Sequence, residues 1–190
     1  VNLLGSVTWA FEFEGQPYFD GFRDLATNGI NKPVFNVFAM LGQMRGDRVS
    51  VASTGALPLD SIRSTSVRGR ADISALASRD ARSVSILVWN YHDDDLPAPP
   101  ADVELSITGL PASRVTVTRN GVDRDHGNSY EKWKAMGSPQ QPTPTQYREM
   151  EQASQLAELA RPAQVQVQAG KVTIPFTLPR QGVTLLRVVW

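Results

Sequence analysis

The stretch Thr8–Asp24, which reads TWAFEFEGQPYFDGFRD, decides how the rest of the sequence is interpreted. It begins inside an apolar segment, Leu3–Phe11, that is short enough to be a buried strand, and a Gly/Pro turn follows directly. Trp9, Glu12 and Glu14 therefore stand at the end of the expected strand. Because α/β barrels build sugar sites at the carboxyl ends of their strands, this stretch predicts a barrel strand with a sugar-binding end.

A helix is expected directly after this strand. Asn31 is a candidate N-cap, and Pro33 suits the first helical turn. Apolar residues recur at i, i+3, i+4 and i+7, namely Val34, Val37, Phe38 and Leu41. We expect residues 1–45 to be the last βα unit of a (β/α)8 barrel. One strand and one helix cannot close a barrel, and Val1 already lies within the strand, so we expect the chain to be the C-terminal part of a larger protein.

Composition excludes several classes of function. The 19 basic and 19 acidic residues balance, which argues against nucleic acid or an anionic membrane as a partner. The absence of cysteine excludes disulfides, thiolate metal sites and a cysteine nucleophile. No run approaches the roughly 18 apolar residues that span a bilayer. Neutral sugars or a protein surface remain as ligands. The compartment is left open between cytoplasm and periplasm, because a signal peptide would stand at the N-terminus of the larger protein.

After Met44 the apolar pattern changes to short runs bounded by Gly, Pro, Asp and Asn, so we place a domain boundary between residues 45 and 46. Val103, Leu105 and Ile107 alternate with polar residues, which indicates one buried and one wet face. Eight such runs predict an antiparallel β-sandwich over residues 46–190. The runs are Arg48–Ser53, Ile73–Ala77, Ser83–Tyr91, Val103–Thr108, Arg114–Arg119, Gln164–Gln168, Lys171–Leu178 and Val183–Trp190. Ser83–Tyr91 is the expected central strand, and Pro175 favours an edge or a bulge for its run.

Two insertions interrupt these strands. Residues 92–100 read HDDDLPAPP. Consecutive acidic residues point in different directions and lack the alternating spacing of a calcium loop, so we expect a solvated acidic loop and no metal site. The second insertion, residues 123–161, is too long for a hairpin and contains a helix with Thr143 as cap and Pro144 in its first turn.

A polar and aromatic cluster lies in the second insertion; its members are Asp125, His126, Asn128, Tyr130 and Trp133. We expect it to pin the insertion through local backbone hydrogen bonds. The alternative is that the insertion leans on the barrel or on another subunit and shapes the entrance of the pocket.

Several motifs resemble one family. They are WAFEFE at 9–14, FDGF at 19–22, NGINKP at 28–33, LVWNYH at 87–92, DHGNSY at 125–130, WKAMGSP at 133–139 and LPRQGV at 178–183. Together they resemble the C-terminal part of the family 39 glycoside hydrolases, the β-xylosidases. The resemblance covers essentially the whole chain, with the segments in the right order.

The resemblance implies a retaining β-xylosidase that releases xylose from the non-reducing ends of β-1,4-xylo-oligosaccharides, without metal or cofactor. Retaining hydrolysis needs two carboxyl groups about 5 to 5.5 Å apart. In this family they come from the fourth and seventh barrel strands, whereas this chain begins at about the eighth. No catalytic residue is therefore expected in this chain. It needs the missing N-terminal barrel as its partner and is expected to be inactive alone.

The resemblance also implies a narrower set of site residues. Trp9 matches the aromatic residue on the floor of the sugar subsite, and Glu14, or alternatively Glu12, matches a carboxylate that binds hydroxyls of the non-reducing xylose. From the residues alone, strand alternation puts both glutamates on one side, roughly 6 to 7 Å apart. A catalytic pair, a sugar ligand and a solvated rim all remain open for them, and Trp9 has a core position as its alternative.

Two other classes of function remain as alternatives. One is a non-catalytic β-sandwich that binds carbohydrate, and the other is a structural domain that braces the barrel or mediates homo-oligomers. For the sandwich alone we favour the structural domain, because the aromatic residues of the sandwich lie mostly on the expected buried faces of its strands. A hydrolase triad is poorly supported, since no Gly-x-Ser-x-Gly motif occurs and there are only two histidines. The sequence leaves the choice between xylose, arabinose and another pyranose open.

Overall fold

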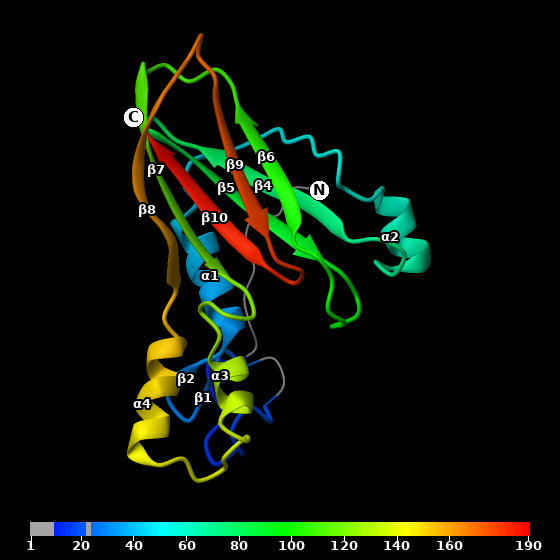
Figure 1. The fold of residues 1–190 in the computed structure, drawn as a ribbon, viewed down its shortest axis with the longest axis vertical. Coiled ribbons are helices and arrows are strands. Elements are labelled where there is room, and N and C mark those ends of the chain that lie inside the picture. Colours follow the sequence, from blue (N-terminus) through cyan, green and yellow to red (C-terminus); the bar gives the residue numbers. More distant parts are fainter. Residues whose placement is uncertain (1–9, 22–23) are drawn as a thin grey trace.

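The computed structural model describes residues 10–21 and 24–190. Its main body is a pair of antiparallel sheets (Figure 1). The larger sheet has the order β3-β4-β5-β10-β7-β8, and β6 and β9 form the smaller one. The strands are β3 Asp47–Val49, β4 Asp72–Arg79, β5 Ser83–Tyr91, β6 Ala101–Ile107, β7 Arg114–Val122, β8 Ala157–Gln166, β9 Val172–Leu178 and β10 Val183–Val189. Each lies at one of the eight runs expected from alternation.

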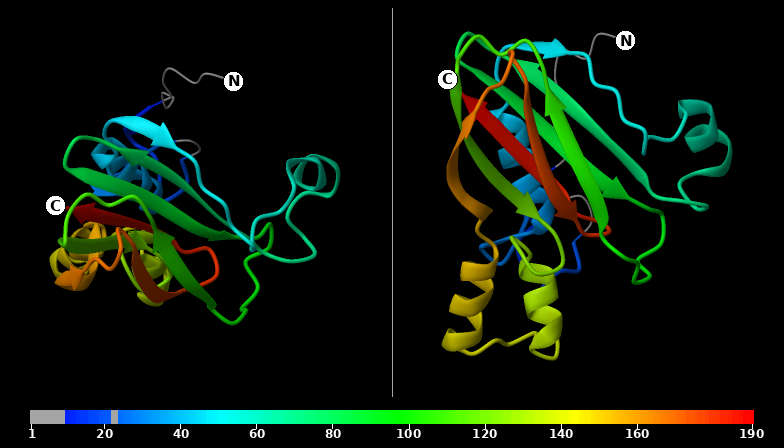
Figure 2. Two further views of the ribbon diagram at one scale, coloured as in Figure 1. Left: turned by 90° about the horizontal axis from the view of Figure 1, so that it is seen from above. Right: turned by 45° about the horizontal axis from the view of Figure 1, so that its top comes forward.

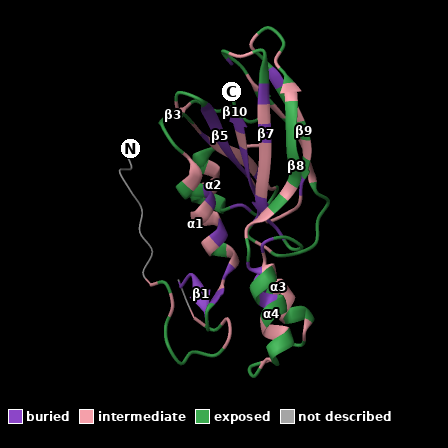
Figure 3. Cartoon of the chain, turned by 90° about the vertical axis from the view of Figure 1, so that its left-hand side faces the viewer, coloured by how far each residue is buried: buried purple, intermediate pink, exposed green. Residues whose placement is uncertain are grey.

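The core lies between the two sheets. Ile86 and Val88 of β5 and Leu186 of β10 are buried there, and Val103 and Ile174 of the smaller sheet pack against them. Figure 3 shows buried residues concentrated on β5 and β10, which lie side by side in the middle of the larger sheet. The expected central position of Ser83–Tyr91 is therefore confirmed. The edge position of Pro175 is confirmed as well, because β9 pairs only with β6 in the described part of the chain.

Helix α1, Pro33–Gln43, covers the other face of the larger sheet, as Figure 2 shows from above. Met40 of α1 is fully buried against Leu87 and Leu185, whose side chains point opposite to those of the sandwich core. The predicted helix is thus confirmed, with Pro33 in its first turn. The predicted cap is wrong: Lys32 is the N-cap, without a side-chain capping bond. Asn31 is unavailable as a cap because it belongs to strand β2 and pairs with Ala26.

A small hairpin precedes α1. It consists of β1, Ala26–Thr27, and β2, Ile30–Asn31. Ala10 forms an isolated parallel bridge with Asp24. The expected barrel strand 3–11 lies mostly outside the described residues, so the barrel unit stays a prediction.

Two helices stand between β7 and β8, namely α3, Ser129–Ala135, and α4, Pro144–Ala153. They pack on each other beyond one end of the sandwich (Figure 2). Thr143 and Gln146 form a reciprocal capping box and Pro144 opens the helix, as the sequence predicts. Strand β8 already begins at Ala157, within the range expected for the insertion, and a β-bulge interrupts its pairing with β7.

A further short helix, α2, Leu59–Thr65, has no buried residue and was not expected, because it lacks an apolar stripe. Within the described part of the chain, every helix is too short or too polar to cross a bilayer.

Candidate functional site

The loop that carries Glu12 and Glu14 is tied to the β1–β2 hairpin. The carbonyl oxygen of Phe11 accepts hydrogen bonds from the amides of Leu25 and Ala26, at 2.8 and 2.9 Å. The Oε1 atom of Glu12 accepts the amide of Gly29 at 2.9 Å. Residues 12 and 13 are not in a strand, and Glu14 already belongs to a turn. The expectation that both glutamates share one strand face is therefore wrong: the backbone turns away at Gly15, whose φ is 70°.

The Asn28–Gly29 turn is the meeting point of three segments. Its φ angles, 48° and 80°, are both positive, as a tight two-residue hairpin turn requires. The Nδ2 atom of Asn28 donates to the carbonyl oxygen of Gln16 at 3.2 Å, which binds the loop. The hydroxyl of Tyr147 on α4 donates to the carbonyl oxygen of Asn28 at 3.2 Å, which binds the insertion.

Tyr18 joins the same polar group. Burial raises its pKa, and the nearby Tyr147 and the carboxylate of Glu12 raise it further. Its backbone is clamped from the insertion: its amide donates to Oε1 of Gln140 at 2.8 Å, and Nε2 of Gln140 donates to its carbonyl oxygen at 3.4 Å. Glu12, Tyr18 and Tyr147 thus gather beside the hairpin turn.

An aromatic cluster forms the second contact between loop and insertion. The ring of Phe19 lies 5.4 Å from that of Tyr130 and 5.0 Å from that of Trp133. Phe19 has a φ of 60°, and its amide donates to Oγ1 of Thr27 at 2.9 Å. The indole N–H of Trp133 donates to the carbonyl oxygen of Pro139 at 3.0 Å. The loop residue with left-handed backbone is therefore fixed on both sides.

The polar residues of the insertion pin it locally, as predicted. Asn128 caps α3 by accepting the amide of Glu131 at 3.1 Å, and its Nδ2 donates to the carbonyl oxygen of Asp123 at 2.9 Å. The Oδ1 atom of Asp123 accepts the amides of Asp125 and His126, at 2.8 and 2.9 Å.

The insertion also leans on the residues around α1. The buried Asn36 donates from Nδ2 to the carbonyl oxygens of Gly127 and Ser154, both at 2.9 Å. The hydroxyl of Ser129 donates to the carbonyl oxygen of Asn31 at 2.6 Å. Contacts therefore support both local pinning of the insertion and its packing against the residues around α1. An effect of the insertion on a pocket entrance stays a prediction.

Sequence reasoning missed a buried ion pair. The Nζ atom of Lys32 binds Oδ1 of Asp24 and donates to the carbonyl oxygen of Gly21 at 3.0 Å. The two side chains are only 11% and 4% exposed. The pair fixes the end of the loop against the start of α1. The β1–β2 hairpin brings Asp24 and Lys32, which are eight positions apart, together, and the sequence analysis did not predict this hairpin.

The acidic loop after β5 is exposed over most of its length and is anchored at its start by His92 and Asp94. His92 is buried; its Nε2 donates to the carbonyl oxygen of Arg68 at 2.9 Å, and its Nδ1 accepts the amide of Asp94 at 3.1 Å. Asp94 pairs with Arg180, and Oδ2 of Asp93 accepts the amide of Val67 at 3.1 Å. The expected solvated loop is confirmed for Asp93 and for residues 95–100, which are exposed, whereas His92 is buried and Asp94 is half-buried. Among the described residues, no three His, Cys, Asp or Glu side chains lie close enough to hold a metal ion.

The three predicted sugar ligands fall in different settings. Trp9 lies outside the described residues. Glu12 is half-buried and already orders the hairpin turn, whereas Glu14 is exposed. Within the described part of the chain, Glu14 makes no ion pair. A carboxylate with free lone pairs can accept hydrogen bonds from sugar hydroxyls, so the loop presents one structural and one available carboxylate.

Comparisons with known proteins agree with the motifs. The model of "Glycosyl hydrolases family 39" matches residues 6–171. A β-xylosidase of Caldicellulosiruptor saccharolyticus is 24% identical over 149 residues, which are 77% of this chain and 28% of that protein.

Two solved structures share the fold. A monomeric β-xylosidase from Caulobacter crescentus CB15 superposes with a TM-score of 0.70 at 19% identity, over 91% of this chain and 34% of that one. An enzyme of the same family from Xanthomonas axonopodis pv. citri gives 0.67 at 20% identity, over 85% and 31%. The chain therefore spans about a third of the length of these relatives. Since the family model matches most of its residues, the chain belongs to glycoside hydrolase family 39.

Proposed function

We propose that this chain is the C-terminal portion of a retaining β-xylosidase, which cleaves β-1,4-xylo-oligosaccharides from the non-reducing end. The observation that carries the proposal is the family match over residues 6–171 in a chain that spans about a third of its relatives. The rest of the barrel and both catalytic glutamates belong to the remainder of the polypeptide, so the chain alone is inactive.

The surface around α1 supports a missing barrel. Phe11, Phe13, Val34 and Leu41 are 54, 41, 42 and 38% exposed, which is high for large apolar side chains. They come from the loop and from one side of α1, where neighbouring barrel elements would pack.

The loop supplies the sugar ligands in this proposal. Glu14 binds hydroxyls of the non-reducing xylose, with Glu12 as the alternative, and Trp9 lines the floor of the subsite. The bond from the Gly29 amide to Glu12 favours Glu14, because one oxygen of Glu12 already has an internal partner.

An aryl β-xyloside assay tests the proposal. The complete polypeptide should hydrolyse it and these 190 residues should not. Hydrolysis by the isolated chain would overturn the proposal that both catalytic glutamates lie outside it. Inactivity of the complete polypeptide would overturn the proposed β-xylosidase function. Glu14→Gln in the complete enzyme should raise the Michaelis constant, whereas an unchanged constant would remove Glu14 from the subsite. An aryl arabinoside measured in parallel decides the sugar preference.

A second role is structural. Two observations favour an insertion that braces the loop. Gln140 forms two hydrogen bonds with the backbone of Tyr18, and Phe19 packs on Trp133. Trp133→Ala in the complete enzyme should lower stability and raise the Michaelis constant. If stability, oligomeric state and Michaelis constant all stay unchanged, the insertion has no such role.

A further inference from the structure

The buried ion pair of Lys32 and Asp24 also holds the backbone of the loop that carries Glu14. The Nζ atom of Lys32 donates to the carbonyl oxygen of Gly21, the last described residue of this loop, at 3.0 Å. Taking two charges out of water is costly, and apolar side chains of similar volume often give the same stability. What this pair adds is a fixed geometry, namely the position of Gly21 relative to the β1–β2 hairpin.

The backbone of Lys32 is fixed from both sides. Its amide donates to the carbonyl oxygen of Leu25 at 2.8 Å, and its carbonyl oxygen accepts the amide of Phe35, in the first turn of α1, at 2.9 Å. Helix α1 is anchored on the larger sheet by Met40, which is fully buried. Lys32 therefore connects the loop to α1, and through α1 to the sandwich.

Gly21 lies so close to the ion pair that no side chain fits at this position. A Cβ atom on Gly21 would collide with the carboxylate of Asp24. The backbone of Gly21 is not in the left-handed region, so the close approach, and not backbone strain, requires glycine here. The carbonyl oxygen of Gly21 and the carboxylate of Asp24 thus share one ammonium group.

The loop is attached at both ends, and Glu14 lies between the two attachments. At the start, the carbonyl oxygen of Phe11 accepts the amides of residues 25 and 26. At the end, Lys32 holds Gly21. Among the described residues, Lys32 supplies the one charged donor to the backbone of this loop, and such bonds are roughly twice as strong as neutral ones. The position of Glu14 therefore depends on Lys32.

We infer that Lys32 is a positioning residue of the sugar subsite: through Gly21 it holds the loop in the conformation in which Glu14 binds the non-reducing xylose. Asp24 compensates the buried charge of the ammonium group. The inference rests on the proposed function and deepens it, because it gives the sandwich and α1 a part in substrate binding. A loop that is ordered before the substrate arrives spends less binding energy on its own ordering.

Steady-state kinetics of the complete polypeptide with an aryl β-xyloside test the inference. Lys32→Met removes the donor to Gly21, so the loop must be ordered at the expense of binding energy. The variant should raise KM roughly five- to tenfold and change kcat less than about twofold. An unchanged KM would overturn the inference.

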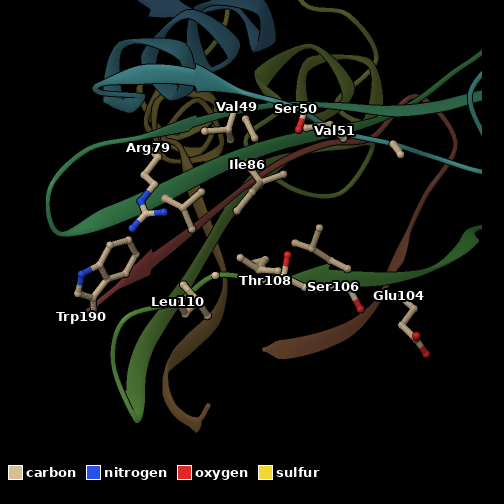
Figure 4. A pocket seen from close by; sticks show the side chains of 16 residues that line it. Val49, Ser50, Val51, Arg79, Ile86, Glu104, Ser106, Thr108, Leu110 and Trp190 are labelled. Atoms are coloured by element: carbon tan, nitrogen blue, oxygen red, sulfur yellow. The ribbon is translucent and has the colours of Figure 1, made fainter. Parts of the chain in front are cut away.

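Arg79→Met is the matched control, because it also removes one cationic side chain. The guanidinium of Arg79 lies beside the ring of Trp190, at 5.4 Å (Figure 4). The C-terminus, at Trp190, lies at the end of the sandwich opposite to α3 and α4 (Figure 1). Arg79→Met should leave KM and kcat unchanged, and a rise in KM equal to that of Lys32→Met would overturn the inference.

The double variant Asp24→Ala, Lys32→Met separates positioning from stability. It removes both charges, so it should recover part of the unfolding midpoint that Lys32→Met loses. Its KM should nevertheless stay raised, because Gly21 still lacks its donor. Recovery of KM together with stability would overturn the inference and leave the pair a purely structural role.

A second cycle tests whether Lys32 acts through Glu14. In the Glu14→Gln background, Lys32→Met should raise KM further by less than about twofold, because the carboxylate that Lys32 positions is already gone. A full additional increase would overturn the inference. The unmodified polypeptide separates the two proposals: if it is inactive, the proposed function fails and the inference fails with it, whereas an active enzyme in which Lys32→Met leaves KM unchanged rejects the inference alone.

Discussion

The sandwich and the junction are held together in different ways; the junction is the contact of residues 10–21 and 24–36 with residues 123–154 of the insertion. In the sandwich, apolar side chains from two strand faces bury each other, so many residues share the stabilisation. In the junction, individual side chains bind backbone groups that lie 91 to 122 positions away in the sequence. Substitutions in the sandwich core should therefore lower the free energy of unfolding more than substitutions in the junction.

The largest effect should come from the sandwich core. Leu186 is fully buried, and Leu186→Ala leaves a cavity that should lower the free energy of unfolding by about 4 kcal/mol. Urea denaturation measures the loss. Val189→Ala on the same strand is the control, because Val189 is 37% exposed and should cost far less. Equal losses would contradict the placement of the core.

The junction should respond most strongly at its buried ion pair. Asp24→Ala leaves the charge of Lys32 buried without its partner, which should cost about 3 kcal/mol. The double variant Asp24→Ala, Lys32→Met removes both charges and should recover part of this loss. A double-mutant cycle without coupling would show that the pair does not hold the loop.

A smaller effect is expected at the hairpin turn. A Cβ atom on Gly29 would lie 2.9 Å from the Tyr147 hydroxyl, in a residue whose φ is 80°. Gly109→Ala is a matched control, with a φ of 74° and no atom within 4 Å of the new Cβ. Strain should cost each variant about 1 kcal/mol, and Gly29→Ala should lose more because Tyr147 must move. Equal unfolding midpoints would mean that the contact between α4 and the turn adds nothing.

The smallest effect concerns pH. Because the folded protein raises the pKa of Tyr18 above 10.0, the neutral phenol favours folding below that value, and this contribution is lost as the pH rises through the folded pKa. Tyr18→Phe should therefore flatten the decline in stability above pH 10. In a pH titration followed by phenolate absorbance, the Tyr18→Phe variant should lose one of the tyrosines that ionise above pH 10. An unchanged titration in this pH range would contradict the burial of Tyr18.

The sandwich was accessible from sequence because alternation reports burial residue by residue. Ser83–Tyr91 was predicted with the bounds that the structure gives to β5. Thr143 and Pro144 were also predicted, since caps are local signals. Asn31 failed as a cap because its place in β2 depends on Ala26, a partner that local propensity does not specify.

The junction was much less accessible. No pattern in the sequence predicts that Gln140 binds the backbone of Tyr18, or that Asn36 donates hydrogen bonds to two carbonyl oxygens of the insertion. The geometry of Glu12 and Glu14 was missed as well: alternation assumes a strand, whereas the backbone turns at Gly15.

The bulge in β8 has a consequence for behaviour at high concentration. Between its pairs Ala160 with Arg119 and Ala163 with Val117, β8 carries Arg161 and Pro162, both exposed. A proline without an N–H, a charge and a local kink are features that prevent edge-to-edge growth of sheets into fibrils. The β8 edge is therefore poorly suited to pairing with a strand of a second copy.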